Sequence, residues 1–346
     1  MDTLTARPQL LKQANLSMIR KVLKTKGTAT RAELAYETQI SSTTVRALLE
    51  EMLKDGEIKS VGYDESSGGR KAERYQFSPD RYHSVAFCIQ HDQSYAILLN
   101  ICGEIVETTR LRISGDDIVQ ALIDYLDDIV SRKEIKSIGI GAPGVVKDDC
   151  FWIQDRIDGQ MRKMDIAAPL SDRYGIPMIL ENDLNATTVG YARGLEKNIW
   201  GVESENINMA YLHLEKGCVS AGFIAGGRII RGNNNFAGEI SLIPMEDGKP
   251  MDVYMAGPMD DEQYIHNITT IIRWICGILN PKYVVLSGID LRMDCINPII
   301  GNISDSLPKH MCAEILYSPD IWQDYLNGMA YLTSKRMFED IQFIQE

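Results

Sequence analysis

The sequence has no apolar run long enough to cross a membrane, and none of its seven cysteines are paired at C-x-x-C spacing. A membrane helix needs about 18 to 20 consecutive apolar residues, so this pattern argues against a membrane protein. Scattered cysteines indicate reduced thiols, not a disulfide framework or a zinc knuckle. The first residues, MDTLTARPQLL, lack the apolar centre of a signal peptide. The sequence therefore predicts a cytoplasmic protein with no membrane partner.

Charge is distributed unevenly along the 346 residues, whose net charge is −12. Residues 1–80 contain 13 Lys and Arg against 11 Asp and Glu, whereas the remainder contains 23 against 37. A nearly neutral N-terminal part on an acidic body fits a small nucleic-acid-binding module carried by a larger domain. The length allows two or three domains. We expect a boundary just after Pro79, which gives a head (residues 1–80) and a body (81–346).

The head has the pattern of a helix-turn-helix. Asn15 is expected to cap a helix over 16–24, and Thr30 with Glu33 forms the capping box of a second helix. Ser41 is expected to cap a third helix over 42–54. Two helices joined by a short turn place the start of the second in the major groove of DNA. The residues expected to contact DNA there are Ser42, Thr43, Thr44 and Arg46.

A β-hairpin is expected to follow these helices, with strands over 57–63 and 74–77. Its glycine-rich tip carries Arg70 and Lys71, whose charges suit contact with the DNA backbone or the minor groove. The alternative is that the head mediates protein contacts only. The salt dependence of any DNA affinity would separate the two, because phosphate neutralisation makes binding weaken steeply as salt rises.

Strands alternate with helices in the body, which indicates α/β layering. A Gly226-Gly227 turn is expected to close a hairpin, since both positions can adopt positive φ. Strands are expected over 84–89, 95–100, 104–111, 137–141, 178–180, 207–214, 219–225, 228–231 and 314–318, and helices over 114–131, 169–174, 184–194, 260–279 and 321–340.

Several motifs resemble those of the ROK family, which comprises repressors, open reading frames and sugar kinases. Residues 181–186, ENDLNA, match the family's Glu-Asn-Asp-Ala-Asn-Ala at five of six positions, and Ala237-Gly238-Glu239 begins a block similar to its Ala-Gly-Glu-Ile-Gly-His. The motif order in the head closely resembles the winged helix-turn-helix of ROK regulators. The resemblance implies two RNase-H-like lobes of the actin–hexokinase type, with a cleft between them, behind that head.

The resemblance implies a sugar-binding side of the cleft. In kinase relatives the equivalent of Asp183 takes the proton from the attacking hydroxyl. Carboxylates and amides can hydrogen-bond with neighbouring sugar hydroxyls. Taken alone, Asp183 would more often be a helix cap, and Glu239 would more often be a surface acid. The family's His is replaced by Leu242 and its cysteine cluster is absent, so no metal and no cofactor are expected. The expected sugar-binding residues are Gly144, Asn182, Asp183, Asn235 and Glu239.

The phosphate-binding side departs from the family pattern. The family's phosphate loop has the pattern Gly-Thr-Gly-x-Gly-x-Gly. When residues 216–222 are aligned with it, Cys218 and Ser220 stand at two of its glycine positions. The family's Asp-x-Gly loop falls near residues 89–91, IQH, which lack the Asp. Backbone N–H groups reach phosphates most easily at glycines. We therefore expect no ATP turnover and no catalytic residue, with Asp183 as the vestigial position of the kinase base.

Together these features predict a sugar-responsive transcriptional regulator, a repressor by family analogy, with a degenerate kinase domain. Its expected partners are a double-stranded DNA operator, a sugar or sugar derivative, and further copies of the chain in a homodimer or higher homo-oligomer. Two alternatives remain. One is an ATP-dependent sugar kinase that also binds DNA, whose sugar-dependent ADP release would be abolished in Asp183→Asn. The other is a regulator whose cleft has lost its ligand and serves as a dimerisation scaffold.

Overall fold

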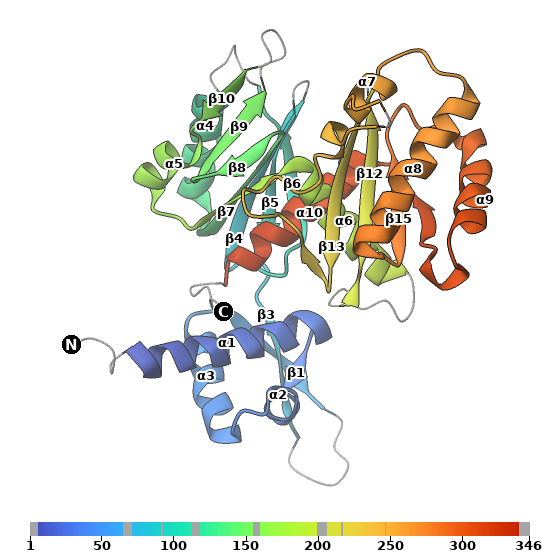
Figure 1. Ribbon diagram of the computed structural model, residues 1–346. Helices are drawn as coiled ribbons and strands as arrows, with labels where there is room; N and C mark the ends of the chain where they lie inside the picture. The colour runs from blue at the N-terminus through green and yellow to red at the C-terminus, as the bar shows by residue number, and fades with distance from the viewer. Residues whose placement is uncertain are drawn as a thin grey trace.

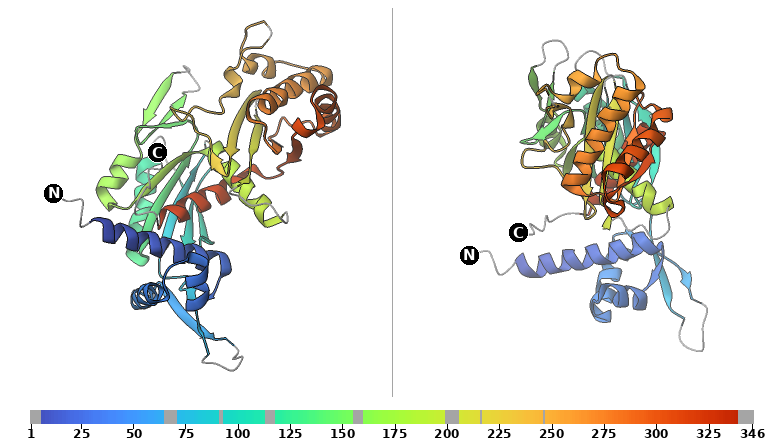
Figure 2. Two further views of the ribbon diagram at one scale, coloured as in Figure 1. Left: turned by 60° about the horizontal axis from the view of Figure 1, so that its bottom comes forward. Right: turned by 45° about the vertical axis from the view of Figure 1, so that its right-hand side comes forward.

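The structure is a computed structural model that describes residues 6–64, 71–90, 93–112, 118–154, 160–198, 206–215, 217–245 and 247–338. Figure 1 shows the head beside a body of two lobes, with helix α1 (Ala6–Lys26) on the side of the head that faces the body. The views in Figure 2 agree with this placement. No helix in the described ranges combines the length and the apolar content of a membrane span.

The head consists of three helices and a three-stranded sheet. After α1 come β1 (Ala29–Thr30), α2 (Arg31–Thr38) and α3 (Ser42–Lys54), and then β2 (Ile58–Tyr63) and β3 (Glu73–Phe77) in the sheet order β1-β3-β2. Helices α2 and α3 form where they were expected because Thr30 and Ser41 cap them as predicted. The Thr30–Glu33 capping box is present, and the hydroxyl of Ser41 accepts a hydrogen bond at the start of α3.

The expected start of the first helix is wrong. The helix α1 begins at Ala6, so Asn15 lies within it and caps nothing. Residues 6–15 are rich in Ala, Leu, Gln and Lys, which favour helix, and Pro8 stands in the first turn, where its missing N–H costs little. The inner faces of the helices form the core of the head, with Ile19, Leu23, Leu34, Val45, Leu49 and Met52 buried.

The first lobe of the body is built on a sheet of order β11-β7-β4-β5-β6. The pairs β4–β5 and β5–β6 are antiparallel, whereas β7 pairs in parallel with both β4 and β11. One face of this sheet packs on two helices that lie near the outside of the lobe. The elements are β4 (His83–Ile89), β5 (Ser94–Asn100), β6 (Ile105–Arg110), β7 (Ile135–Ala142), β11 (Met178–Asn182), α4 (Ile118–Arg132) and α5 (Ala167–Tyr174).

The second lobe repeats this plan with a sheet of order β14-β13-β12-β15-β16. The expected Gly-Gly turn joins β13 to β14, with φ of 55° at Gly226 and 71° at Gly227. The outer face packs on α8 and α9. The elements are β12 (Met209–Glu215), β13 (Cys218–Ala225), β14 (Arg228–Ile229), β15 (Tyr283–Ser287), β16 (Glu314–Tyr317), α7 (Met251–Met255), α8 (Asp261–Leu279) and α9 (Ile296–Ser306).

Two helices, α6 (Asp183–Asn198) and α10 (Ile321–Arg336), pack on each other between the two sheets (Figure 1). Glycine makes their close approach possible. A Cβ on Gly190 of α6 would lie 1.8 Å from the carbonyl oxygen of Asp324, and one on Gly328 of α10 would lie 1.8 Å from that of Ala186. Because backbone meets backbone at both points, side chains are excluded there. The crossing therefore fixes how the lobes meet.

Three further features of the body were not expected from the sequence. A second small sheet of order β10-β9-β8 lies beside the first lobe, formed by β8 (Val145–Lys147), β9 (Cys150–Gln154) and β10 (Met161–Met164). The short helix α7 and the helix α9 belong to the second lobe. The small sheet matters for function, because its first strand begins directly after Gly144.

Candidate functional site

The start of α3 presents the residues expected to contact DNA. Ser42, Thr43 and Arg46 are exposed, while the Thr44 hydroxyl lies 2.8 Å from the Ser41 hydroxyl and is partly buried. The Arg46 guanidinium donates to the Glu50 carboxylate at 2.8 Å. Such an exposed ion pair contributes little to stability, so a DNA base or phosphate can compete for Arg46. The hydroxyl of Thr44 is therefore engaged with Ser41, whose own hydroxyl caps α3 by accepting from the Thr44 N–H.

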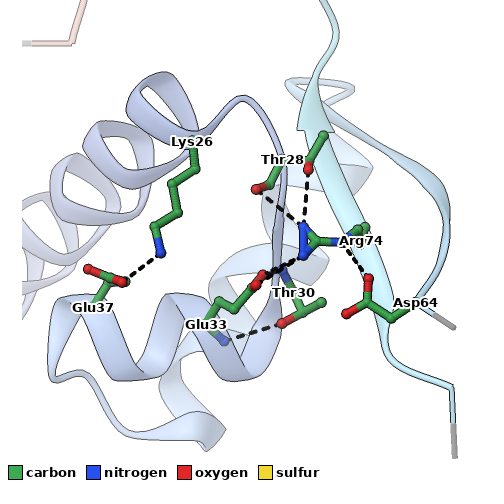
Figure 3. A network of polar contacts seen from close by, with 7 residues as sticks. All are labelled: Lys26, Thr28, Thr30, Glu33, Glu37, Asp64 and Arg74. Carbon is green, nitrogen blue, oxygen red and sulfur yellow. Dashed lines mark hydrogen bonds and ion pairs between the residues drawn. The ribbon is translucent and has the colours of Figure 1, made fainter. Parts of the chain in front are cut away.

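The hairpin that forms the wing is tied to α2 by Arg74, as Figure 3 shows. The Arg74 guanidinium on β3 donates to Glu33 at 2.9 Å and to the hydroxyl of Thr28 at 3.1 Å, and it also pairs with Asp64. Glu33 accepts from the backbone N–H of Thr30 at 2.7 Å in the same arrangement. One carboxylate thus serves both the helix cap and the wing, which fixes the hairpin relative to α2 and, through α2, to α3.

The tip of the wing lies partly outside the described residues, and Arg70 is among those left out. Lys71 is described and exposed. Lys59 on β2 adds a second exposed cation to the wing. No role was expected for Arg74 from the sequence. Its partner Glu33 lies 41 residues earlier in the chain, and no local pattern around Arg74 indicates this pairing.

Asp183 is the first residue of α6, at the junction of the lobes. Its Oδ1 accepts from the N–H of Leu184 at 2.8 Å, and its Oδ2 accepts from the Gln90 amide at 2.9 Å. Burial raises the pKa of Asp183, and the hydrogen bonds from Leu184 and Gln90 oppose that rise. His213 on β12 is close enough for its charge to act on Asp183 as well. Neither Gln90 nor His213 was singled out from the sequence.

Asn182 and Gly144 lie side by side but are engaged with protein. The Asn182 amide donates to the carbonyl oxygen of Gly144 at 2.9 Å, and its Oδ1 accepts from the N–H of Asn185 at 3.0 Å, as a helix cap does. Gly144 has a φ of 103°, and a Cβ there would meet the carbonyl oxygen of Trp152 at 2.5 Å. A glycine at this position is therefore required by the backbone, whatever binds nearby.

Two hydrogen-bonded contacts join the lobes beside Asp183. Arg231, which follows β14, donates from Nε to the buried carboxylate of Glu181 on β11 at 3.1 Å. Asn235 has a left-handed φ of 54° and donates to the carbonyl oxygen of Val146 at 2.6 Å. Residues 231–235 of the second lobe are thereby held against the first lobe. Asn235 was expected near the sugar, and its amide nitrogen instead binds the backbone of β8.

Glu239 faces the same junction from the second lobe. Its side chain keeps contact with solvent, but the surrounding protein raises its pKa by desolvation, and the charge of Asp183 raises it further. The charge of Asp183 therefore reaches Glu239, which indicates that the two carboxylates lie near each other. Gly238 allows this approach, since its φ is 106° and a Cβ would lie 1.9 Å from the carbonyl oxygen of Ala221. The five expected sugar-site residues thus come from three neighbouring segments.

The segment compared with the family's phosphate loop lies where β12 connects to β13. Glu215 pairs with Cys218, and the N–H of Gly217 donates to the Asp290 carboxylate at 2.9 Å. Desolvation raises the pKa of the Cys218 thiol, and the charges of Asp252, Asp290 and Glu215 raise it further. The described surroundings of this turn are therefore acidic. Gly222 also serves packing, since a Cβ there would lie 2.0 Å from the Thr188 hydroxyl.

Metal binding has no support in the described ranges, where no three His, Cys, Asp or Glu side chains gather in a way that could hold an ion. The surroundings of Asp183 can offer carboxylate acceptors and amide donors to a ligand rich in hydroxyl groups. An open groove between α8 and α9, lined by Thr269 and Arg273 among others, lies on other elements and has no connection to this site.

Two lobes of the actin–hexokinase type and a winged head define the class of the fold, and solved structures share it. A ROK family transcriptional regulator, described as a homologue of the E. coli MLC protein, aligns with a TM-score of 0.72 over 95% of this chain and 98% of its own, at 15% identity. The ROK hexokinase from Thermus thermophilus aligns with a TM-score of 0.56 over 73% of this chain and 99% of its own, at 17% identity. The predicted fold class is confirmed.

Residues 90–259, nearly half of the chain, match the model of the ROK family, which is the family that the motifs resemble. The xylose repressor of Caldicellulosiruptor bescii is 26% identical over 240 residues, which cover 67% of this chain and 58% of that protein. The regulator NagC of Escherichia coli K12 is 21% identical over 246 residues, which cover 68% and 59%. The aligned region thus spans about 60% of the length of these relatives.

Proposed function

We propose that this protein is a sugar-responsive, DNA-binding transcriptional regulator that acts as a repressor in the cytoplasm. The head would bind an operator through Ser42, Thr43, Thr44 and Arg46, with Arg70 and Lys71 on the wing. The relatives named xylose repressor and NagC support this role. The observation that carries the proposal is the contrast at the lobe junction. Asp183 is near enough for its charge to raise the pKa of Glu239, while in the connection between β12 and β13 the N–H of Gly217 donates to the Asp290 carboxylate.

This contrast favours a regulator over a kinase. Phosphoryl transfer depends on backbone N–H groups and cations that neutralise phosphate charge. The carboxylate of Asp290 already accepts a hydrogen bond from the N–H of Gly217. A phosphate would have to displace Asp290 from this N–H and would also approach the negative charges of Asp252 and Glu215. We therefore propose that ATP is neither bound nor hydrolysed.

The proposed effector is a sugar held by Asp183 and Glu239, with Asn182, Asn235 and Gly144 shaping the site. The names of the relatives suggest D-xylose and N-acetylglucosamine as first candidates. Hydroxyl groups would donate to the two carboxylates, so binding requires the ionised forms. Because the pKa of both acids is raised, sugar affinity should begin to fall at a higher pH than ordinary Asp and Glu side chains would require.

We further propose a homodimer, because two heads related by a two-fold axis match the two halves of a pseudo-palindromic operator. The half-sites would be separated by one helical turn of DNA, about 34 Å, or a multiple of it. A sugar that binds one arrangement of the lobes better than another would change how the heads are presented. Its effect cannot exceed that differential affinity, typically about 1–3 kcal/mol.

A three-part experiment tests the proposal. Duplexes that bind the full chain are enriched from a random-sequence pool, and the melting temperature is recorded with D-xylose, D-glucose, N-acetylglucosamine and their phosphates. ADP release is measured with each sugar and Mg-ATP. Asp183→Asn is compared with Asp172→Asn, which makes the same change at an exposed site. We expect duplex enrichment, a sugar-dependent melting shift that Asp183→Asn abolishes and Asp172→Asn keeps, and no ADP release.

The possible failures point to different conclusions. Sugar-dependent ADP release that Asp183→Asn abolishes would establish the kinase that also binds DNA. Duplex enrichment with no melting shift from any sugar would favour a regulator whose site has lost its ligand. Failure to enrich any duplex, even at low salt, would remove the DNA-binding role of the head.

A further inference from the structure

The C-terminal end of α10 forms part of the core of the head. Met337, directly after the helix, is 6% exposed and packs in the same cluster as Ile19, Leu23 and Phe77. The ring of Phe338 stacks on that of Phe77, with centroids 6.2 Å apart. These two residues are separated from the head by about 260 residues of chain, yet they complete its apolar interior.

Charged groups of the head hold this segment in place. The Arg20 guanidinium lies over the Phe338 ring, 4.7 Å from its centroid, and binds the buried Glu57 carboxylate with two hydrogen bonds of 2.6 and 2.8 Å. Lys24 on α1 also donates to the hydroxyl of Ser334 in the last turn of α10 at 3.3 Å. The contact is thus both apolar and polar, and it joins α10 to α1 and to β3.

The other end of α10 lies against the residues of the sugar site. The hydroxyl of Tyr325, which is 1% exposed, is 3.5 Å from the carbonyl oxygen of Ile89. The next residue, Gln90, donates to Asp183. Asp324 accepts from the hydroxyl of Tyr211 on β12 at 3.2 Å, so the first turn of α10 contacts both lobes. A change in how the lobes meet at Asp183 would therefore act directly on this turn.

We propose that α10 transmits the liganded state of the Asp183 site to the head, and that Met337 and Phe338 are the contact through which it does so. This inference rests on the proposed sugar-dependent DNA binding. It specifies the contacts through which sugar binding at Asp183 would affect the head. From Tyr325 to Arg336 the helix spans about 16 Å, and a packed helix moves as a unit over that length. A displacement at the sugar site therefore repositions the interior of the head, and α3 with it.

The test compares Phe338→Ala with Phe338→Tyr, which keeps the ring stacked between Phe77 and Arg20. For each variant we measure the Kd of D-xylose, or of the aldose that shifts the wild-type melting temperature. We also measure the Kd of the enriched duplex with and without that sugar. In the wild type the sugar should change the duplex Kd about tenfold or more. In Phe338→Ala the change should shrink to about twofold while the sugar Kd stays within about twofold. Phe338→Tyr should behave as the wild type.

Hydrogen exchange on the wild-type chain gives a second measurement that needs no variant to fold. Adding the sugar should alter amide protection in α1 around Arg20 and in β3 around Phe77, as well as in α10. The route through α10 is wrong if the wild type responds to sugar and Phe338→Ala keeps the full response. It is also wrong if a sugar that alters duplex binding leaves hydrogen exchange around Arg20 and Phe77 unchanged. A wild type with no sugar response at all would instead overturn the proposed function.

Discussion

A single buried histidine makes the fold sensitive to acid. The His83 side chain is 1% exposed, and neither ring nitrogen has a hydrogen-bond partner among the residues that the structure describes. Burial lowers the pKa of His83, the charge of Lys133 lowers it further, and Asp80, whose carboxylate is 4.0 Å away, opposes the change. A folded pKa below the ordinary value of about 6.5 means that the unfolded chain binds the proton first as pH falls. Acid therefore favours unfolding.

We predict that the free energy of unfolding falls by about 1 kcal/mol between pH 7.5 and pH 5.5 because of His83, and that His83→Phe removes this part of the pH dependence. Urea denaturation at three pH values would measure it. The matched control is His266→Phe, since His266 is exposed. An unchanged pH dependence in His83→Phe would show that His83 is solvated or paired in solution.

A partly buried group, Asp324, should respond to pH in the opposite direction. Burial raises its pKa to about 6, and the hydrogen bonds from Ser318 and Tyr211 oppose this. Because the folded pKa exceeds the unfolded one, the protonated form contributes stability at low pH that is lost as pH rises through about 6. Asp324→Asn keeps both hydrogen bonds without the charge.

At pH 7.5 we expect Asp324→Asn to stabilise the protein by about 1–2 kcal/mol, after allowance for partial solvent screening of the carboxylate. The gain should shrink toward pH 4.5. Thermal unfolding at both pH values measures it, with Asp305→Asn as an exposed control of equal charge change. Destabilisation at pH 7.5 would mean that the charge itself is needed where α10 meets β12.

The residues that could be recognised from sequence are those whose motif is contiguous. Asp183 stands inside ENDLNA and Glu239 inside Ala-Gly-Glu, and the structure brings their charges together. The residues that were missed have partners far along the chain. Gln90 reaches Asp183 across 93 positions, and the N–H of Gly217 reaches Asp290 across 73. No local pattern encodes such pairs, because they exist only once the strands are assembled.

Among elements, those with strong periodicity or explicit caps were predictable, and short polar or interrupted ones were not. The third helix of the head matches its expected bounds because Ser41 marks its start. Strand β10, with sequence MRKM, has no apolar alternation, since it is an edge strand of a small exposed sheet. Helix α9 contains Pro298 and Gly301, which argue against a helix, yet Pro298 stands in the first turn, where no N–H partner is lost.

The crossing of α6 and α10 provides a prediction at this scale. Alanine at Gly190 would bring its Cβ within 1.8 Å of a backbone oxygen of α10, and the helices would have to separate. We expect Gly190→Ala to lower the free energy of unfolding by about 3 kcal/mol. Gly194→Ala lies one turn further along the same helix with no atom within 4 Å, and it should raise the stability by about 0.5–1 kcal/mol.

Chemical denaturation of the two variants side by side measures both effects. They share the substitution, the helix and the change in helix propensity, so their difference isolates the packing between α6 and α10. Equal effects would mean that the two helices are less closely packed in solution than in the structure, and the route proposed through α10 would lose its rigid support.

For the whole molecule, a near-neutral head on an acidic body favours confining the proposed DNA contact to a few residues. The body carries 37 acidic against 23 basic residues beyond position 80, and it repels the phosphate backbone. The proposed DNA-binding face of the head is the one that bears α3 and the wing. Each phosphate contact made there releases counterions, so it contributes about 0.9 to the slope of log K against log salt concentration.

This additivity allows the number of bound heads to be counted, because a homodimer loses two contacts for each substitution. We expect Lys71→Ala to reduce the salt slope of duplex binding by about 1.8 if two heads bind one operator, and by about 0.9 if one head binds. Fluorescence anisotropy with the enriched duplex between 50 and about 300 mM salt measures the slope. Lys309→Ala removes the same charge from an exposed site on the body and should leave the slope unchanged. A slope that Lys71→Ala does not alter would take the wing out of the DNA interface, since a lost phosphate contact cannot leave counterion release unaffected.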